Sequence, residues 1–293
     1  MDTLIFKMCK KIKTIERKVV DLIHETVTSI PEDVERALKI AYENEKSELA
    51  RIQLKTILEN IKIAREEGIP VCQDTGIFTF YVGINEGCNI NPRDLEKAII
   101  TATKKATKEV PLRENVVHPI TREATNDNIG YRIPIIEFEF NESLDKNEVL
   151  ISLLVKGAGS ENMSFLAMLE PSQSIDGIKN FVLKKVKEAK GKPCPPTILG
   201  IGIGGTSDLA MKLAKKALLR SLDDRNHERV FAKMEKDLLE KINSLGIGPM
   251  GLGGKTTCLG VKIEHAYCHT ASLPIGLVMQ CWAHRKSSIK LEI

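Results

Sequence analysis

Apolar positions at helical spacing fall in several separate stretches of the chain. The pattern over 32–67 predicts two helices, because Ser29 and Pro31 precede it and Gly68 and Pro70 follow it, as is typical of helix starts and ends. Further helices are predicted at about 94–108, 172–189, 208–222 and 228–245.

Alternating or β-rich runs lie between and after these helices. They predict strands at 77–82, 131–140 and 149–156, and short strands and loops over 255–284. The mixture predicts an α+β fold with a helical N-terminal region and a mixed or antiparallel sheet surrounded by helices. The chain has no repeat, low-complexity tract or linker, so we predict a single domain over 1–293. The best candidate for a domain boundary, 141–147, also fits a simple hairpin turn between two strands.

Composition narrows the class of protein. The chain has 293 residues, of which 42% are apolar and 28% charged, as in soluble globular proteins. Its net charge of +4 is spread along helical stretches, which indicates solvated helix faces and no nucleic-acid groove. No run approaches the ~20 apolar residues of a membrane span, and the start lacks the apolar run of a secretory signal. The seven cysteines are an odd number, which argues against a scaffold of disulfides. These features together predict a reducing, cytoplasmic location.

Three cysteines occur in settings that disfavour burial as small apolar side chains: Cys72, Cys194 and Cys281 are each surrounded by prolines, glycines, amides or charged residues. Their spacing is far too wide for a zinc finger or a ferredoxin, so only the fold could bring them together. Three thiolates on a cubane cluster leave one iron without a protein ligand. Such an iron is a Lewis acid for a carboxylate and a hydroxyl, which suits the addition or removal of water.

Two glycine-rich segments suggest a nucleotide site as an alternative. Gly200–Gly205 matches the spacing of a dinucleotide-binding turn, but the helix after it leads into another helix. We therefore prefer a close approach of this backbone to the cluster or to a bound carboxylate. The second segment, 248–256, resembles a phosphate loop, yet its first glycine is one residue too distant and a helix precedes it.

The chain resembles the N-terminal, or alpha, part of the class I iron-sulfur fumarate hydratases and the similar L(+)-tartrate dehydratases. The motifs that carry the resemblance, in the family's order, are Val71–Gly76, Arg113 with Asn115, Lys156–Asn162, Ile201–Thr206 and His269–Arg285. The resemblance implies cluster-binding loops and a [4Fe-4S] cluster with three cysteine ligands and one open iron. The ligands would be Cys72, Cys194 and Cys281. Cys258 and Cys268 lie in the same C-terminal region, and the family motif, not the spacing, selects Cys281.

The resemblance also implies which residues contact substrate. These are Gln73, Asp74, Arg113, Gly157, Ser160, Glu161 and Asn162. An arginine suits a carboxylate, which it can hold through paired hydrogen bonds. Asp74 and His269 are the expected catalytic residues, transferring protons near the hydroxyl that is added or lost.

The predicted function is therefore that of the alpha subunit of a two-subunit hydro-lyase, which interconverts fumarate and L-malate. A beta subunit with the C-terminal-type domain would supply the base at C3, in a higher hetero-oligomer, so this chain alone should be nearly inactive. L(+)-tartrate dehydratase alpha subunit is the alternative. A cluster-binding subunit without activity and, more distantly, a nucleotide-binding protein complete the alternatives.

Overall fold

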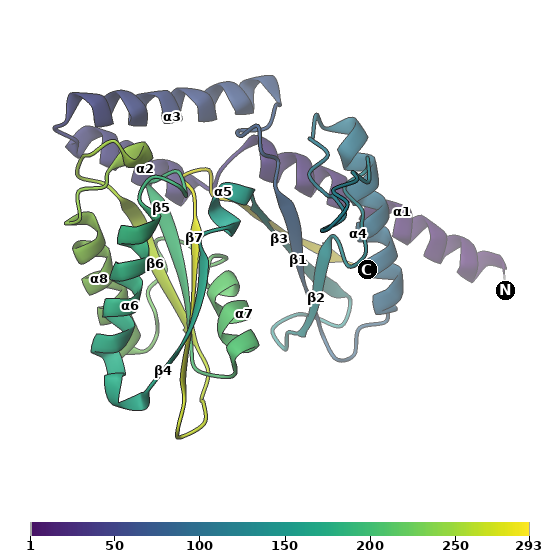
Figure 1. Ribbon diagram of the computed structural model, residues 1–293. Coiled ribbons are helices and arrows are strands. Elements are labelled where there is room, and N and C mark those ends of the chain that lie inside the picture. Colours follow the sequence, from purple (N-terminus) through teal and green to yellow (C-terminus); the bar gives the residue numbers. More distant parts are fainter. Residues whose placement is uncertain (1, 293) are drawn as a thin grey trace. The chain divides into compact units, whose positions relative to one another are not determined.

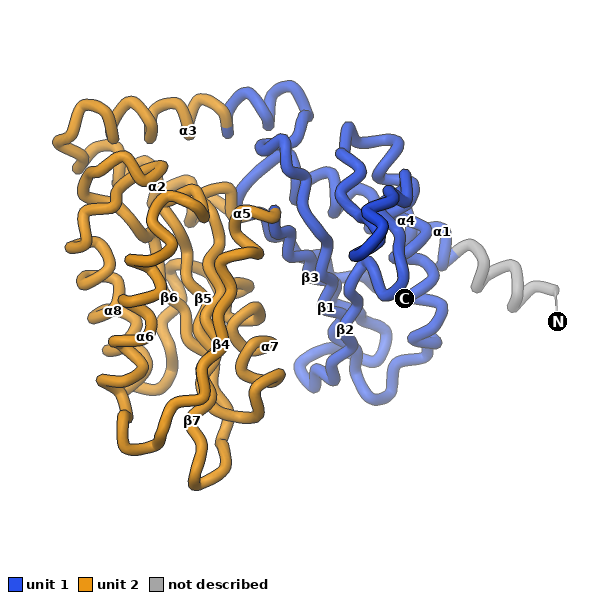
Figure 2. Tube along the Cα trace, viewed as in Figure 1, with its two compact units in different colours: residues 1–30, 61–157, 285–293 blue, residues 31–60, 158–284 orange. Residues whose placement is uncertain are grey.

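The computed structural model describes the backbone of residues 2–292 and the side chains of residues 11–292. The chain divides into two compact units, each assembled from separate stretches (Figure 2). Unit 1 comprises Met1–Ile30, Ile61–Gly157 and Arg285–Ile293, and unit 2 comprises Pro31–Asn60 and Ala158–His284. That residues 1–293 act as one domain stays a prediction.

Unit 1 contains a four-stranded mixed sheet. Its strands, in spatial order, are β2 (Ile135–Phe140), β1 (Ile77–Ile84), β3 (Glu148–Lys156) and β8 (Arg285–Glu292). β1 pairs in parallel with β2 and antiparallel with β3, and β3 pairs antiparallel with β8. The connection at 141–147 is therefore no hairpin between neighbours, because β1 lies between the two strands it joins.

Two helices of unit 1, α1 (Asp2–Thr28) and α4 (Pro92–Glu109), pack against each other, and α1 also contacts β3 and β8 (Figure 1). Helix α4 begins where Asn91 accepts a hydrogen bond from the Arg93 N–H, with proline in the first turn. Its apolar positions recur every three or four residues, so one side is buried. These side chains form one apolar core with α1, β1 and β3.

Unit 2 contains a second four-stranded mixed sheet. Its spatial order is β4 (Ser164–Leu169), β7 (Leu273–Gln280), β5 (Thr197–Ile203) and β6 (Cys258–His265). β7 is antiparallel to both neighbours, and β5 is parallel to β6. Helices α6 (Ser174–Ala189) and α8 (Arg229–Asn243) share an apolar core with this sheet, and α7 (Ser207–Ala217) packs on the opposite face (Figure 1).

Glycines in the sheet allow α7 to lie close to it. A Cβ on Gly200 would be 2.0 Å from the carbonyl oxygen of Ala214, and one on Gly202 would be 2.0 Å from that of Ala210. Any side chain at these glycines would collide with the helix backbone. The presence of glycine at 200 and 202 is thus explained by the packing of α7 on the sheet.

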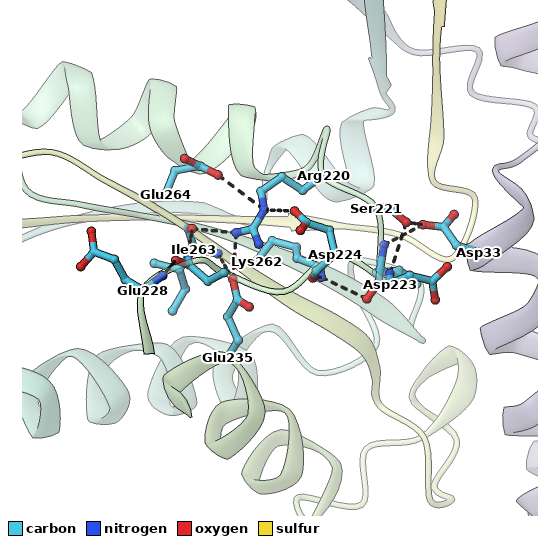
Figure 3. Close-up of polar contacts among 12 residues, drawn as sticks. Asp33, Arg220, Ser221, Asp223, Asp224, Glu228, Glu235, Lys262, Ile263 and Glu264 are labelled. Atoms are coloured by element: carbon cyan, nitrogen blue, oxygen red, sulfur yellow. Dashed lines mark hydrogen bonds and ion pairs between the residues drawn. The ribbon is translucent and has the colours of Figure 1, made fainter. Parts of the chain in front are cut away.

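The turn after α7 is held by a cluster of charged side chains around Arg220 (Figure 3). Arg220 Nη1 donates to Glu235 and to the carbonyl oxygen of Ile263, both at 2.9 Å, and its Nε donates to Asp224 at 2.7 Å. Glu235 is itself buried. Because charge-assisted hydrogen bonds are strong when shielded from water, this cluster ties the end of α7 to α8 and β6.

The remaining elements are α2 (Glu32–Asn44), α3 (Glu48–Glu67), α5 (Ala158–Glu161), η1 (Pro171–Gln173) and η2 (Pro249–Gly251). The two helices predicted over 32–67 are confirmed as α2 and α3. The α+β class is also confirmed, with two mixed sheets. In the described part of the chain, no helix is both long enough and apolar enough to cross a membrane.

Candidate active site

The first group of site residues lies in unit 1, in the turn between α3 and β1. The turn starts where the Val71 N–H donates to the carbonyl oxygen of Val27 at 2.9 Å. Cys72 follows and is half-buried, and the next residue, Gln73, is exposed. The turn therefore presents a thiol and an amide next to each other.

Asp74 is held on several sides within this turn. Its Oδ1 accepts the Gly76 N–H at 2.9 Å and lies 3.3 Å from Nδ2 of Asn115. A Cβ on Gly157 would be 2.7 Å from the other carboxylate oxygen, so glycine is required there. The carbonyl oxygen of Asp74 accepts a hydrogen bond from Nη1 of Arg285 at 2.8 Å. The carboxylate is therefore fixed in one position.

Arg113 is placed beside this turn by its backbone. Its N–H donates to Thr75 Oγ1 at 3.1 Å, and its carbonyl oxygen accepts from Nδ2 of Asn128 at 3.0 Å. The guanidinium itself is exposed. Unit 1 thus brings together five of the residues predicted from sequence, namely Cys72, Gln73, Asp74, Arg113 and Gly157.

Sequence reasoning assigned no role to Arg285, although its side chain is 1% exposed and touches Asp74. Its Nε has no hydrogen-bond partner. A charged residue at the start of an amphipathic strand usually faces water, so no sequence signal marked it as buried. Asn115 belonged to the motif that carries the resemblance, but its contact with Asp74 was not foreseen.

In unit 2, Cys194 lies in a tight turn after α6. Its backbone adopts φ +53°, and its N–H donates to the carbonyl oxygen of Gly191 at 3.0 Å. Its own carbonyl oxygen accepts the N–H of Trp282 at 3.2 Å. Because Trp282 directly follows Cys281, the two half-exposed cysteines lie at the same end of the unit 2 sheet. We call this end, where β5 begins and β7 ends, the cysteine end.

Helix α5 adds polar residues at the cysteine end. Ser160 Oγ donates to Oε1 of Gln280 at 3.4 Å, and both side chains are buried. The Glu161 carboxylate pairs with Nζ of Lys215 on α7 at 2.7 Å. Asn162 follows at the exposed end of the helix. Helix α5, with Ser160, Glu161 and Asn162, therefore lies near Cys281, and a shared site for these residues stays a prediction.

The other cysteines of unit 2 lie in different environments. Cys258 is fully buried and its thiol donates to the carbonyl oxygen of Gly260 at 3.2 Å; burial raises the pKa of this thiol to about 12. It stays protonated near neutral pH and is unsuited to ligation. Cys268 is exposed in the loop between β6 and β7, where its thiol donates to the carbonyl oxygen of Ser272.

His269 lies in that same loop, at the far end of the sheet. Thr197 at the start of β5 pairs with Cys258, whereas Ile203 at its end pairs with His265, just before the loop. Since a strand rises about 3.3 Å per residue, β5 separates the two ends by roughly 20 Å. Within one chain, His269 is thus remote from Cys194 and Cys281, and Gly204–Thr206 lie at the same far end.

Thiolate ligands for a metal or cluster require accessible cysteine side chains, and the described part of the chain contains several. In the described part of the chain, no three His, Cys, Asp or Glu side chains form a group that could hold one metal ion. A cubane cluster takes one thiolate at each separate iron. Cys72, Cys194 and Cys281 are half-exposed thiols outside the helices and strands. Cys88, also half-exposed, packs instead against the apolar core of unit 1.

Comparison with known proteins gives the family. Residues 16–290 match the model of the family described as fumarate hydratase (Fumerase). A Methanocaldococcus jannaschii protein, provisionally named L(+)-tartrate dehydratase subunit alpha, is 55% identical over 94% of this chain and 96% of its own length. A Geobacillus stearothermophilus protein, provisionally named fumarate hydratase class I, is 36% identical over 92% of this chain and 54% of its length.

The Escherichia coli L(+)-tartrate dehydratase subunit alpha is 30% identical over 89% of this chain and 86% of its own length. The chain belongs to the fumarate hydratase family, and fumarate hydratases and tartrate dehydratases are hydro-lyases. The family and the enzyme class predicted from the sequence are therefore confirmed.

Proposed function

We propose that this chain is the alpha subunit of a two-subunit [4Fe-4S] hydro-lyase that interconverts fumarate and L-malate. The observation that carries the proposal is the cysteine end of unit 2. There Cys194 and Cys281 are connected through the Trp282 N–H and lie beside α5 with its polar residues. Unit 1 supplies Cys72 and Asp74 from one turn.

Cys72, Cys194 and Cys281 would hold the cluster. When bound, it supplies a Lewis acid at the iron that lacks a protein ligand. Their competitors are less suitable, since Cys258 is a buried, protonated thiol and Cys268 lies at the far end of the sheet. A cluster of this kind requires a reducing compartment, in agreement with a cytoplasmic location.

The other residues of this chain bind and orient the substrate. Arg113 is exposed and can hold a carboxylate through two parallel hydrogen bonds, while Gln73 offers an amide beside it. Asp74, fixed by its neighbours, accepts a proton from the attacking water during hydration and returns it to the departing hydroxyl during dehydration. Lys215 neutralises Glu161, which lets a dianionic substrate approach α5.

A beta subunit would complete the enzyme. Relatives that match nearly the whole chain are named as alpha subunits, which implies such a partner. We propose that the partner carries the C-terminal-type domain and supplies the base that acts at C3. The isolated chain should then show almost no hydratase activity, and addition of the partner should restore it.

L(+)-tartrate dehydration is the second candidate function. The observation that favours it is the 55% identity to a protein named for that activity. Both substrates are four-carbon hydroxy-diacids with the same carboxylate spacing, so the site residues suit either. Assays of L-malate and L(+)-tartrate with the reconstituted pair would decide between them by the ratio of kcat/KM.

Neither of the two glycine-rich segments supports the nucleotide-binding alternative. The glycines of β5 face α7. In the second segment, the N–H of Lys255 already donates to the chain's own Glu45 carboxylate at 2.8 Å. Neither segment therefore presents a free cradle for phosphate.

The proposal is tested by anaerobic purification, with iron and sulfide analysis and an electronic spectrum. About four irons per chain are expected, and Cys72→Ser, Cys194→Ser and Cys281→Ser should each lose them. Cys258→Ser is the control and should retain its iron. Full retention in the three variants, or no iron after reconstitution, would contradict the proposed site. A retained cluster without activity, even with the beta subunit, would indicate a non-catalytic subunit.

A further inference from the structure

Glu45, in the connection between α2 and α3, is a buried carboxylate surrounded by backbone donors. Its Oε1 accepts the N–H groups of Lys46 and Ser47 at 2.9 and 3.0 Å, and its Oε2 accepts the N–H of Lys255 at 2.8 Å. Burial raises the pKa of Glu45, but these donors, with that of Thr256, hold it below its ordinary value. The carboxylate is therefore ionised and fully bound at neutral pH.

The segment that binds this carboxylate through its N–H groups is 248–256, the segment that resembles a phosphate loop. Gly254 adopts φ +120°, and a Cβ there would be 2.9 Å from Oε2 of Glu45 and 2.7 Å from Cβ of Ala50. Only glycine lets the loop come this close. The loop is an anion-binding nest of backbone N–H groups, and its anion is a side chain of the same unit.

The same loop also contacts the turn that carries Cys194. The Met250 N–H donates to the carbonyl oxygen of Pro195 at 2.7 Å. A Cβ on Gly251 would be 2.6 Å from Cα of Gly191, so the two backbones are in direct contact. The loop, which includes η2, thus lies between the α2–α3 connection and the cysteine end of unit 2 (Figure 1).

Cys194 depends on this support because of its conformation. It is a non-glycine residue at φ +53°, and an L-residue occupies this left-handed region only where its surroundings enforce it. Pro195, directly after Cys194, accepts the hydrogen bond that the Met250 N–H donates. Gly251 contacts Gly191, whose carbonyl oxygen accepts the Cys194 N–H. The loop therefore holds the turn on both sides of the cysteine.

We propose that Glu45 is a positioning residue for Cys194, acting through the glycine-rich loop 248–256. Glu45 fixes the loop, and the loop fixes the turn that presents the thiol. The relevance to catalysis rests on the proposed ligand role of Cys194, but the mechanical connection can be measured without any cluster.

The test uses alkylation of the full-length, cluster-free chain, followed at each cysteine by mass spectrometry. Glu45→Gln keeps the shape of the side chain but replaces one acceptor oxygen with an NH₂ group, so one pair of N–H donors loses its partner. Cys194 should then be alkylated about tenfold faster, and deuterium exchange should rise in 190–196 and 248–256. Glu43→Gln, on an exposed position of α2, is the matched control and should leave both unchanged.

Cys72 and Cys268 in the same sample are internal controls, because Cys72 belongs to unit 1 and Cys268 lies at the far end of the unit 2 sheet. Equal acceleration at all cysteines would show general loosening, and an unchanged rate at Cys194 would show no connection; either result overturns the proposal. Gly254→Ala disturbs the contact between the loop and Glu45 from the side of the loop, and it should reproduce the selective effect at Cys194. Gly246→Ala, also at positive φ with open space around it but outside the loop, should not.

Iron analysis of the same variants separates this inference from the proposed function. A selective rise at Cys194 with a lower iron content in Glu45→Gln supports both. A selective rise in a protein whose wild type binds no iron supports the positioning role and contradicts the cluster.

Discussion

Gly157 and Asp74 are so close that a methyl group on the glycine would lie 2.7 Å from Oδ2 of the carboxylate. No real Cβ atom tolerates such a contact without movement. Gly157 is the last residue of unit 1 before the chain enters unit 2 for the second time, at Ala158, whereas Asp74 lies in the turn before β1. The absence of a side chain at one position thus defines where the proposed proton-transfer group lies.

Gly157→Ala should therefore displace the Asp74 carboxylate. We expect kcat/KM of the reconstituted enzyme to fall about 100-fold, because a shift of about 1 Å in a catalytic group costs that much. Iron content should be retained, since no cysteine is touched. Gly83→Ala, in β1 with ordinary contacts of 3.5 Å, is the control. Unchanged kinetics in Gly157→Ala would remove Asp74 from the mechanism.

Arg285 should be important for stability as well as for the site. Arg285→Met removes the donor to the Asp74 carbonyl oxygen, and we expect the free energy of unfolding to fall by about 2 kcal/mol, as for other hydrogen bonds from charged groups. Urea denaturation measures it. Lys290→Met, on an exposed position of the same strand, should leave the midpoint unchanged. A loss no greater than in that control would show that the contact contributes nothing.

The Glu45 nest should make stability depend on pH in acid. Because the pKa of Glu45 is lower in the folded state, its contribution is complete above the ordinary glutamate pKa of about 4.3 and is lost as pH falls through the folded value. Wild type should exceed Glu45→Gln in unfolding free energy by about 1–3 kcal/mol at pH 7, and the difference should shrink below pH 4. A difference independent of pH would show that the ionised carboxylate is not responsible.

If His269 acts at the proposed cluster, we expect it to come from a second copy of the chain, because β5 separates it from Cys194 and Cys281 of its own unit. His269→Ala and Cys194→Ser chains should each be inactive with the beta subunit. When the two are expressed together, mixed assemblies should recover activity, since one chain supplies the ligand and the other the histidine. If mixing restores nothing, His269 does not act across copies. If His269→Ala is fully active, it has no catalytic role.

Much of the fold could be predicted from the sequence. The amphipathic periods gave the helices α2, α3, α4, α6, α7 and α8 to within a few residues, because their apolar positions face sheets or neighbouring helices. Strand β1 was found for the same reason. The predicted strand near 131–140 is shorter, because β2 begins only at Ile135. Strands β4, β5 and β8 and helix α1 were not among the predicted elements.

The candidate site was harder to predict in detail. The motifs named the residues, and unit 1 and the cysteine end of unit 2 each bring some of them together. The resemblance named His269 together with Cys281, yet strand β7 lies between them, so the catalytic role of His269 stays a prediction. The glycine patterns were misleading too, since their spacing reflects helix packing at Gly202 and binding of Glu45 at Gly254. Pattern alone cannot tell a ligand from a side chain of the same protein.

The position of β8 at the edge of the unit 1 sheet has a consequence for biosynthesis. This strand follows all of unit 2 in the chain, yet it pairs with β3. A ribosome must therefore translate unit 2 completely before the first sheet can close and before Arg285 can reach the Asp74 turn. Nascent chains expose the open edge of β3 in the meantime, and the site around Asp74 matures only at a late stage of translation.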